Sequence, residues 1–313
     1  MVHTNYFTCV TTNQTRNLQE LEFSTDYNIP IVKKASKHSV AIVGFSIPNI
    51  ATPLFEYGTV DPLIVTRANI GLVGNQYVVN TIFGQASCTV YDYGLGPGVV
   101  TSYYQIVRTI NEAFAAANAG SGFTDPVMSY SSTTGLFTIT VDPLEPQQWI
   151  FSRSLVNRFP TFAYQYLLQL DQTFGAINFG SGNPALNVAV QENVALWALH
   201  DYNRLVVTAP NLPIDSTQSA VSGSGDPLAV RTLASFENSD VGFNRSAFVY
   251  SESGLGNWTL HDFKTSVEIS NLSLKFYAVN LQNQLRPIVL TPGSSALIKL
   301  AFVEDTLVYG QNL

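Results

Sequence analysis

An alternation of apolar and polar residues near the C-terminus constrains the fold more than any other feature. Residues 296 to 303 alternate between the two sides of an extended chain: Ala296, Ile298, Leu300 and Phe302 lie on one side, and Leu297, Lys299, Ala301 and Val303 on the other. Ser266 to Val279 alternates similarly, apart from a slip near Asn271 that predicts a bulge or a break into two strands. Period-two alternation is typical of half-buried β-strands. Turn signals at 280–283 and 291–293 separate the runs, so this part predicts antiparallel strands that close a sandwich.

Further short strands are predicted along the chain, each bounded by Gly, Asn or Pro. They cover residues 2–10, 39–47, 63–66, 77–83, 87–93, 148–151, 186–190, 205–207 and 247–251, while 164–171 fits helix or strand equally well. Ser102 to Ala119 predicts a helix, because an apolar stripe follows a Ser cap and precedes Gly120. Residues 123–130 and 136–141 predict a hairpin. Residues 174–184 and 212–227, rich in Gly, Ser, Asn and Pro, predict long loops.

The order of these elements favours one fold class. Many short strands, one clear helix and no βαβ rhythm predict a mostly β chain built as an antiparallel sandwich. The helix and its hairpin lie in the middle of the chain, which indicates a second domain inserted into the first.

Composition limits the function classes. Charged residues make up 12% of the chain, about half of the usual ~25%. Polar uncharged residues must therefore cover much of the surface, which suits either a protein buried against neighbours or a secreted β-protein. A net charge of −7 argues against general attraction to nucleic acid or to anionic membranes. The N-terminus does not resemble a signal peptide, and no apolar run is long enough for a membrane span, so we expect a cytosolic, reduced protein.

No combination of residues predicts an active site. None of the four histidines, His3, His38, His200 and His261, has a metal-binding spacing. The pairs His200-Asp201 and His261-Asp262 are adjacent in sequence, so in a strand their side chains would point to opposite faces. The run Gly94–Gly98 reads GLGPG, which departs from the dinucleotide fingerprint, and Pro97 removes a donor, so it predicts a turn. We expect no enzyme activity, no catalytic residues, no cofactor and no metal.

Three other groups of residues have a structural and a functional interpretation. Lys33, Lys34 and Lys37 form a basic cluster, which we interpret as a solvated turn rather than a nucleic-acid contact. Trp149, Trp197 and Trp258 are favoured as core residues over glycan-stacking platforms. Cys9 and Cys88 are favoured as free buried thiols, with a single bridge as the alternative.

Two blocks of sequence resemble a known family. The C-terminal run LRPIVLTPGSSALIKLAFVED is similar to the closing strands of jelly-roll vertex proteins from icosahedral DNA viruses. The middle block has the order of motifs found in capsid proteins of virophages and of Polinton-like and adintovirus elements: RTINEAFAAANAG, DPVMSYSSTTGLFTITVD and QQWIFSRSLVNRFPTF. Together the blocks cover roughly half of the chain. The chain thus resembles a penton, the vertex capsid protein of such viruses.

This resemblance implies a specific architecture. It implies a jelly-roll base domain, which we place at 1–60 plus 235–313, and an inserted upper domain at 61–234 that contains the helix. It also implies a homopentamer in the virion vertex, made in the host cytoplasm, that contacts the major capsid protein. A host receptor or glycan is a further partner to consider. The alternatives are a double-jelly-roll major capsid protein and a glycan-binding spike or lectin-like module.

Overall fold

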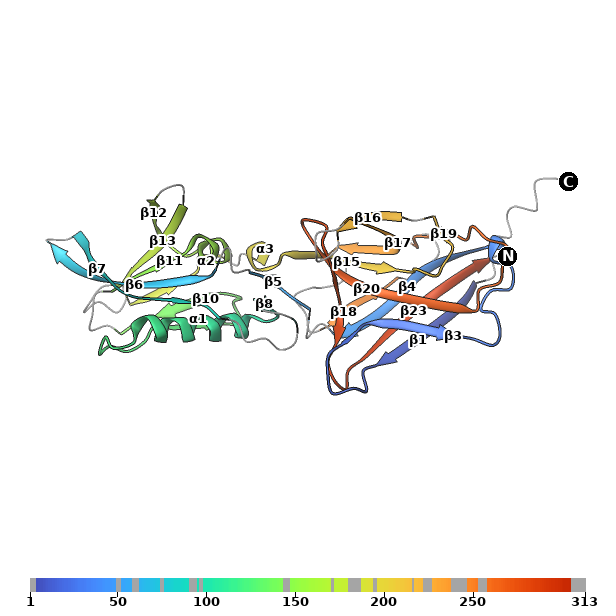
Figure 1. The fold of residues 1–313 in the computed structure, drawn as a ribbon, viewed down its shortest axis with the longest axis horizontal. Helices are drawn as coiled ribbons and strands as arrows, with labels where there is room; N and C mark the ends of the chain where they lie inside the picture. The colour runs from blue at the N-terminus through green and yellow to red at the C-terminus, as the bar shows by residue number, and fades with distance from the viewer. Residues whose placement is uncertain are drawn as a thin grey trace. The chain divides into compact units, whose positions relative to one another are not determined.

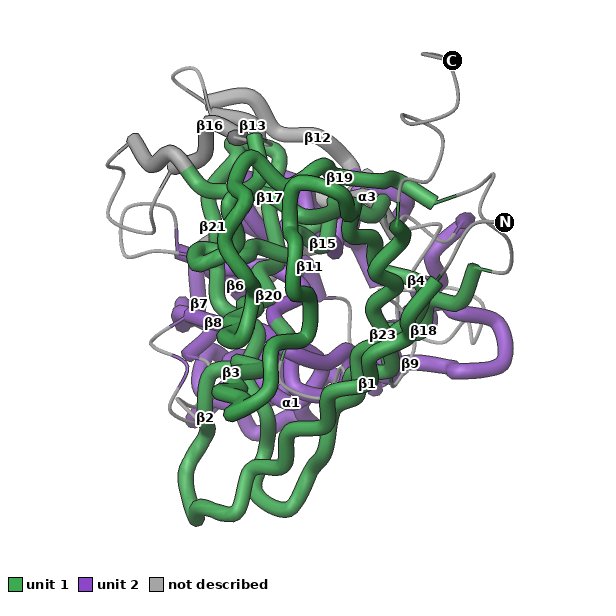
Figure 2. The backbone as a smooth tube through the Cα atoms, turned by 90° about the vertical axis from the view of Figure 1, so that its right-hand side faces the viewer, with its two compact units in different colours: residues 1–52, 202–313 green, residues 53–201 purple. Residues whose placement is uncertain are grey.

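The computed structural model describes residues 4–48, 52–57, 62–73, 76–89, 95, 98–142, 147–169, 172–179, 187–193, 196–215, 217–221, 227–237, 247–252 and 258–304. The chain divides into two compact units, shown in different colours in Figure 2. Unit 1 comprises Met1–Thr52 and Tyr202–Leu313, and unit 2 comprises Pro53–Asp201. Unit 2 is therefore inserted into unit 1 along the sequence.

The division between the units differs from the boundaries expected from the sequence, 1–60 plus 235–313 and 61–234. Residues 202–234 lie in unit 1, because β15 (Tyr202–Thr208) pairs with β20 (Asn271–Asn280) along most of its length. Residues 53–60 fall in unit 2, where β5 (Phe55–Glu56) pairs with β8 (Val99–Val100). The boundaries of the insertion do not show in the sequence, because these pairings join segments far apart in the chain.

Unit 1 is a sandwich of two sheets (Figure 1). The first sheet, here called the β4 sheet, has the order β1 (Thr4–Thr12), β23 (Ser295–Glu304), β4 (His38–Pro48) and β18 (Ala247–Ser251), with β19 (His261–Asp262) also paired to β4. The second, the β20 sheet, has the order β16 (Thr217–Val221), β17 (Pro227–Glu237), β15 and β20, with β3 (Glu22–Asp26) and β21 (Leu285–Pro287) both paired to β20. β2 (Gln19–Glu20) pairs with β22 (Val289–Leu290), and the 3₁₀ turn η1 (Ala35–Lys37) precedes β4.

The strand order of this sandwich is that of a jelly roll. Successive long strands of the chain mostly alternate between the sheets, giving β1-β23-β4-β18 on one side and β3-β20-β15-β17 on the other. Two four-stranded sheets connected in this way bury a common core between their inner faces. The prediction of a mostly β jelly roll with an inserted β-rich unit is confirmed.

The core of unit 1 contains the residues that the C-terminal alternation selects. Ala296, Ile298, Leu300 and Phe302 of β23 are all at most 2% exposed. Leu272, Leu274, Phe276 and Ala278 of β20 face them from the other sheet in the same hydrophobic cluster. Burying one such large side chain contributes about 1.5–3 kcal/mol. The slip at Asn271 marks the start of β20, while Val267 before it is exposed.

Unit 2 is built around a sheet with the order β12 (Gln165–Gln169), β13 (Gln172–Phe179), β11 (Gln147–Phe151), β6 (Ile64–Val73) and β7 (Gln76–Ser87). A second sheet contains β14 (Val188–Val190), β10 (Phe137–Thr140) and β9 (Val127–Tyr130). The short helices α2 (Arg153–Arg158) and α3 (Leu196–Leu199) complete the unit. The predicted hairpin is confirmed by the antiparallel pairing of β9 with β10.

The predicted helix is α1 (Tyr103–Asn118). The Ser102 hydroxyl caps it by accepting from the backbone N–H of Gln105 at 3.1 Å, and Gly120 follows its end with a φ of +81°. Its apolar stripe is buried in the core of unit 2 and includes Ile106, Ile110, Ala113, Phe114 and Ala117. The helix contacts β6, β7 and β9, so it joins the two sheets of the unit.

Three local predictions are wrong, and one of them fails because a strand contains a glycine. Residues 212–227 were expected in a loop, but 217–221 form β16, which pairs with β17. Residues 174–179 were expected in a loop but belong to β13, where a Cβ on Gly175 would lie 2.7–2.8 Å from the side chains of Tyr164 and Val156. The strand expected at 77–83 lies within β7, which continues through Gly84, but the strand expected at 87–93 is wrong because β7 ends at Ser87 and residues 88 and 89 are not in a strand. In both strands glycine permits a close approach and not a turn. Residues 90–93 lie outside the described residues.

Candidate interaction site

The two histidine–aspartate pairs do not form joint sites. His200 Nε2 lies 2.7 Å from the hydroxyl of Tyr103, whereas Asp201 pairs with Arg158. In β19, Asp262 accepts a hydrogen bond from the Ser39 hydroxyl at 2.6 Å. Each aspartate therefore has a partner other than the histidine beside it, although only His261 and Asp262 lie in a strand, as the sequence argument assumed. His3 and most of the Gly94–Gly98 run lie outside the described residues.

The tryptophans and cysteines singled out in the sequence are buried wherever the structure describes their side chains. Trp149 is fully buried in unit 2 and Trp258 is 9% exposed in unit 1, so neither presents an open stacking face. The side chain of Trp197 lies outside the described residues. Cys9 and Cys88 are free and buried, and burial raises their thiol pKa values to about 11 and about 12. Both thiols therefore stay protonated at neutral pH and are poor nucleophiles.

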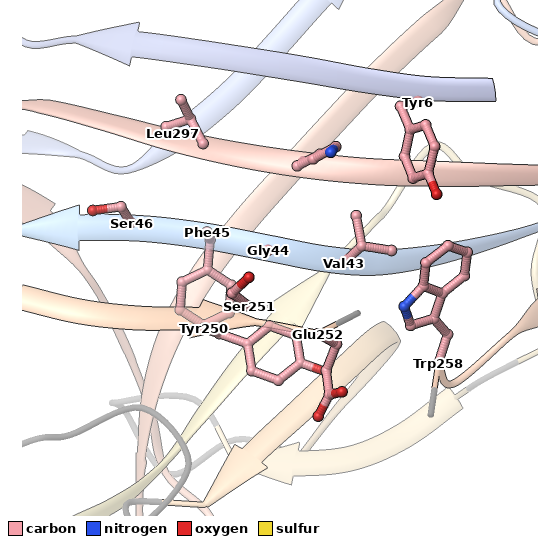
Figure 3. A pocket seen from close by; sticks show the side chains of 11 residues that line it. Tyr6, Val43, Gly44, Phe45, Ser46, Tyr250, Ser251, Glu252, Trp258 and Leu297 are labelled. Carbon is pink, nitrogen blue, oxygen red and sulfur yellow. The ribbon is translucent and has the colours of Figure 1, made fainter. Parts of the chain in front are cut away.

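Unit 1 has a groove of about 500 Å³ on the outer face of the β4 sheet (Figure 3). Four strands and the segment at Trp258 line it, with Tyr6, Val43, Gly44, Phe45, Ser46, Tyr250, Ser251, Glu252, Trp258, Leu297 and Lys299. The register of β4 against β23 shifts between Lys299 and Leu300. Such a bulge re-aims side chains, and here it allows Val43 to face outward while Phe45 faces the core.

Aromatic and charged side chains define the chemistry of this groove. The ring of Tyr6 meets Trp258 edge to face with centroids 6.1 Å apart, and the Lys299 ammonium lies 4.4 Å from the Tyr6 ring centroid. Trp258 packs on Ala41, Val43, Ala301 and Val303. Its indole nitrogen is buried and has no hydrogen-bond partner among the described residues. Buried donors of this kind are usually satisfied, by protein or by ordered water.

The groove has no evident catalytic chemistry. The side chains that line it include no histidine and no cysteine, and its hydroxyls are those of serine and tyrosine. Within the described residues, no group of three or more His, Cys, Asp or Glu side chains is placed to hold a metal ion. None of the helices in the described part of the chain has the length and hydrophobicity needed to cross a membrane.

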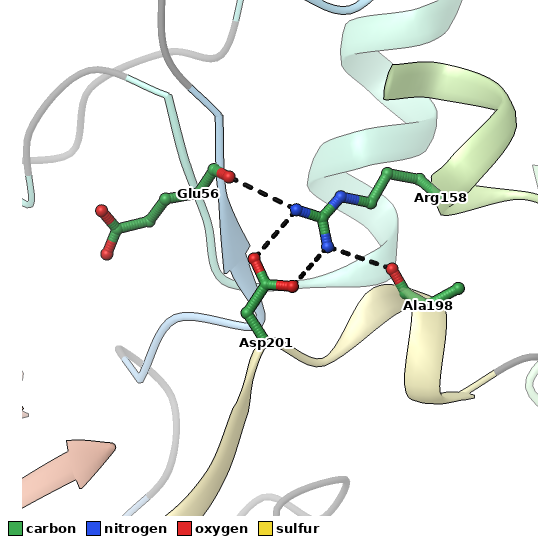
Figure 4. A network of polar contacts seen from close by, with 4 residues as sticks. All are labelled: Glu56, Arg158, Ala198 and Asp201. Carbon is green, nitrogen blue, oxygen red and sulfur yellow. Dashed lines mark hydrogen bonds and ion pairs between the residues drawn. The ribbon is translucent and has the colours of Figure 1, made fainter. Parts of the chain in front are cut away.

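In unit 2 a polar cluster surrounds Arg158 at the end of α2 (Figure 4). Its guanidinium donates to both carboxylate oxygens of Asp201, at 2.6 and 2.9 Å, and to the carbonyl of Ala198 at 3.1 Å. It also lies 4.3 Å from the ring centroid of Phe55 and donates to the carbonyl of Glu56 at 3.5 Å. Arg158 thus joins the segment that enters unit 2 to the segment that leaves it. No sequence pattern indicates this cluster.

A pH effect is expected from His200. Burial lowers its pKa to about 4, partly offset by Asp201, so the folded chain holds it neutral. The unfolded chain protonates it near pH 6.5. Neutral His200 therefore contributes its full stability above pH 6.5. As the pH falls from 6.5 toward 4, the free energy of unfolding decreases by at most about 1.4 kcal/mol per pH unit. Thermal unfolding of His200→Gln should show a shallower pH dependence in this window, and a dependence equal to that of the wild type would contradict it.

Comparison with known proteins gives structural matches without sequence matches. No protein-family model and no curated protein matches the chain. The crystal structure of the mavirus penton protein matches with a TM-score of 0.67 at 16% identity, covering 96% of this chain and 99% of that one. A chain of the cryo-electron microscopy structure of the Sputnik virophage matches with a TM-score of 0.70 at 18% identity, covering 97% and 99%. At these identities the likeness establishes the fold, over nearly the whole of both chains.

Proposed function

We propose that this chain is a structural capsid protein that forms pentameric vertices of an icosahedral virus shell. The observation that carries the proposal is the match to the mavirus penton protein over 96% of this chain. The match includes the jelly roll and the inserted unit together, so it extends beyond the common sandwich. A jelly roll alone would carry little weight, because this fold hosts many functions.

The architecture favours this role over the alternatives. In the described residues only unit 1 has jelly-roll strand order, whereas unit 2 is a helix packed between two sheets. This arrangement supports a single-roll vertex protein over a double-roll major capsid protein. A lectin-like role is less favoured, because Trp149 and Trp258 are buried.

The proposal includes partners and a location. Five copies would contact each other through the flanks of unit 1, and the ring would contact the major capsid protein in the virion. Synthesis in the host cytoplasm, and receptor or glycan binding by the inserted unit, are further parts of the proposal. We attribute no catalytic activity, cofactor or direct nucleic-acid binding to the chain. The low share of charged residues, 12%, supports a surface largely covered by neighbours.

Cryo-electron microscopy of the virus particle tests this function. We expect density for this chain at the fivefold axes, with the jelly roll as five copies around each axis. Electron microscopy of the purified chain with its shell partners provides a second view, in which rings of five are expected. Density at threefold plates or away from the fivefold axes would contradict the assignment.

A further inference from the structure

The outer strand β1 of the β4 sheet has a free edge. Within the described residues it pairs with β23 alone. Just beyond it, Asn13 donates its backbone N–H to the carbonyl of Ser294 at 3.0 Å and accepts from the N–H of Gly293 at 2.9 Å, so its main-chain groups face β23. This direction alternates along a strand. The N–H and C=O groups of the even-numbered residues from 6 to 12 therefore face the free edge, where the described part of the chain provides no main-chain partner.

This edge has none of the features that usually protect an exposed strand. β1 is nine residues long, contains no charged residue, proline or glycine, and keeps one register against β23 throughout. Two other edge strands of unit 1 differ, because β18 has five residues and β21 carries Arg286 and Pro287. Natural proteins shorten, charge, bulge or cover their edge strands to prevent pairing with another chain. The long, uncharged edge of β1 indicates that another strand covers it in the assembled protein.

Apolar side chains are exposed on both faces of the sheet beside this edge. Tyr6 and Val10 are 55% and 63% exposed on the outer face. On the inner face Phe7 is only partly buried, and its ring lies 5.1 Å, centroid to centroid, from the ring of Tyr27, which is 38% exposed. A strand added here would cover apolar groups on both faces, so it needs apolar residues at successive positions.

We infer that residues 305–313 of a second copy of this chain add to the free edge of β1 as a further strand. This contact rests on the proposed vertex function and identifies how neighbouring copies meet. The segment reads DTLVYGQNL, is as long as β1 and has one charged residue, Asp305. The consecutive residues Leu307, Val308 and Tyr309 supply apolar side chains to both faces, and valine and tyrosine favour strands.

The place where β23 ends favours exchange between copies. Val303 pairs with Thr4, so the chain leaves the sheet beside the first residue of β1. To reach the free edge of its own β1, the segment would cross two strand spacings, about 9.6 Å, which uses about three residues. Too few residues would then remain to cover the edge. A straight continuation instead reaches about 30 Å beyond Glu304, which is enough to lie along β1 of a neighbouring copy.

Exchange of this kind suits a ring. The donated segment and the accepting edge are different surfaces, so each copy donates one strand and accepts one, and the contact is head-to-tail. Such a contact closes into a ring when the rotation is suitable. By contrast, pairing of β1 with β1 of a second copy would be twofold and would stop at a dimer. Main-chain hydrogen bonds along β1 would supply the affinity, as in other complexes formed by strand addition.

Site-specific photo-cross-linking in the full-length chain tests the occupant. A benzophenone amino acid replaces Val10, and chains labelled with a heavy isotope are mixed with unlabelled chains before assembly into particles and irradiation. We expect cross-linked peptides that join β1 of one copy to residues 305–313 of another, in labelled and unlabelled combinations. The control places the same group at Val249 of β18, which is 52% exposed at the opposite edge of the sheet, and should give no peptide from 305–313. A cross-link only within one chain, to β1 of a second copy, to another protein or to nothing would overturn the inference.

A matched pair of substitutions at Thr8 tests the main-chain contact. Thr8→Pro removes an N–H that faces the free edge, where proline is tolerated because no hydrogen bond within the sheet is lost. Self-association, measured by sedimentation over a concentration series, should weaken about tenfold with the melting temperature nearly unchanged. Thr8→Ala removes the exposed side chain but keeps the N–H, so it should associate as the wild type does. Equal self-association of Thr8→Pro and the wild type would overturn the inference, and the cross-link still tests it if Thr8→Pro does not fold.

Hydrogen exchange, resolved by residue, tests which side of β1 is covered. In the dilute chain the amides of Thr8 and Val10 should exchange fast, whereas those of Phe7 and Cys9 are protected by β23. On assembly the amides of Thr8 and Val10 should become protected as well. Unchanged exchange at these two residues in assembled particles would contradict the added strand.

The same experiments separate this contact from the proposed function. If the chain occupies the fivefold vertices but Val10 does not cross-link to residues 305–313, the vertex function stands and the inferred contact fails. If the cross-link forms between copies but the chain lies away from the vertices, the contact stands and the vertex function fails.

Discussion

Replacing Gly84 with alanine is expected to destabilise unit 2 by about 3 kcal/mol or more. A Cβ at this position would lie 2.1 Å from the backbone oxygen of Ala117 and 3.0 Å from its carbonyl carbon. The obstacle is the backbone of α1, which cannot rotate away as a side chain can. The helix and β7 must therefore separate, which disrupts the packing of Phe114 and Trp149, whose ring centroids are 4.8 Å apart.

Calorimetry combined with hydrogen exchange measures this effect. Exchange protection should fall in α1 and remain unchanged in β23, which belongs to unit 1. Gly120→Ala is the control: its φ is +81°, but nothing lies within 4 Å of the added Cβ. It should cost only the strain of a left-handed backbone, about 1–2 kcal/mol. Equal losses of stability for the two substitutions would show that the close approach of β7 to α1 does not limit the side chain at position 84.

Replacing Arg158 with methionine is expected to cost about 2 to 3 kcal/mol, because it leaves the Asp201 carboxylate without its cation. The value lies below that of a fully buried pair, since the two side chains are 18% and 33% exposed. The substitution also removes the donors to the carbonyls of Ala198 and Glu56. Methionine retains much of the apolar stem, so the loss reports mainly on the polar contacts.

A second ion pair in the same unit provides the matched control. Arg108 and Glu112 pair at 2.8 Å on the surface of α1, with side chains 67% and 58% exposed. Arg108→Met should change stability by less than about 0.5 kcal/mol, because solvent already screens the pair. Urea unfolding of both variants gives the comparison. A loss for Arg158→Met no larger than for Arg108→Met would mean that the Arg158 cluster has no special role.

The sequence predicts the features of this fold that depend on local periodicity. Ile298 and Phe302 lie on the side of the C-terminal run that the period of a strand selects as apolar, and both are buried in the core. The end of α1 was predicted because glycine after a helix permits a positive φ. Each of these signals depends on residues only a few positions apart, so it can be read from a single sequence.

Features that depend on distant pairings could not be predicted in this way. Gly175 was interpreted as a loop residue, since only the position of Tyr164 and Val156 shows why a glycine is needed in β13. Arg158 and Asp201 are 43 residues apart, and neither lies in a recognisable motif. The groove at Trp258 combines separate strands of one sheet, and the unpartnered indole nitrogen becomes visible only when its surroundings are known.

The meeting of the two connecting segments at the base of unit 2 has an evolutionary consequence. The carbonyl of Leu54 accepts a hydrogen bond from the backbone N–H of Asp201 at 2.9 Å, so the inserted unit begins and ends at one place. An inserted domain is well tolerated by the domain that carries it when its two ends lie close together. Lineages can exchange, shorten or elaborate it while the strands on either side, β4 and β15, keep their register. The inserted unit is therefore free to diverge faster than the sandwich that carries it.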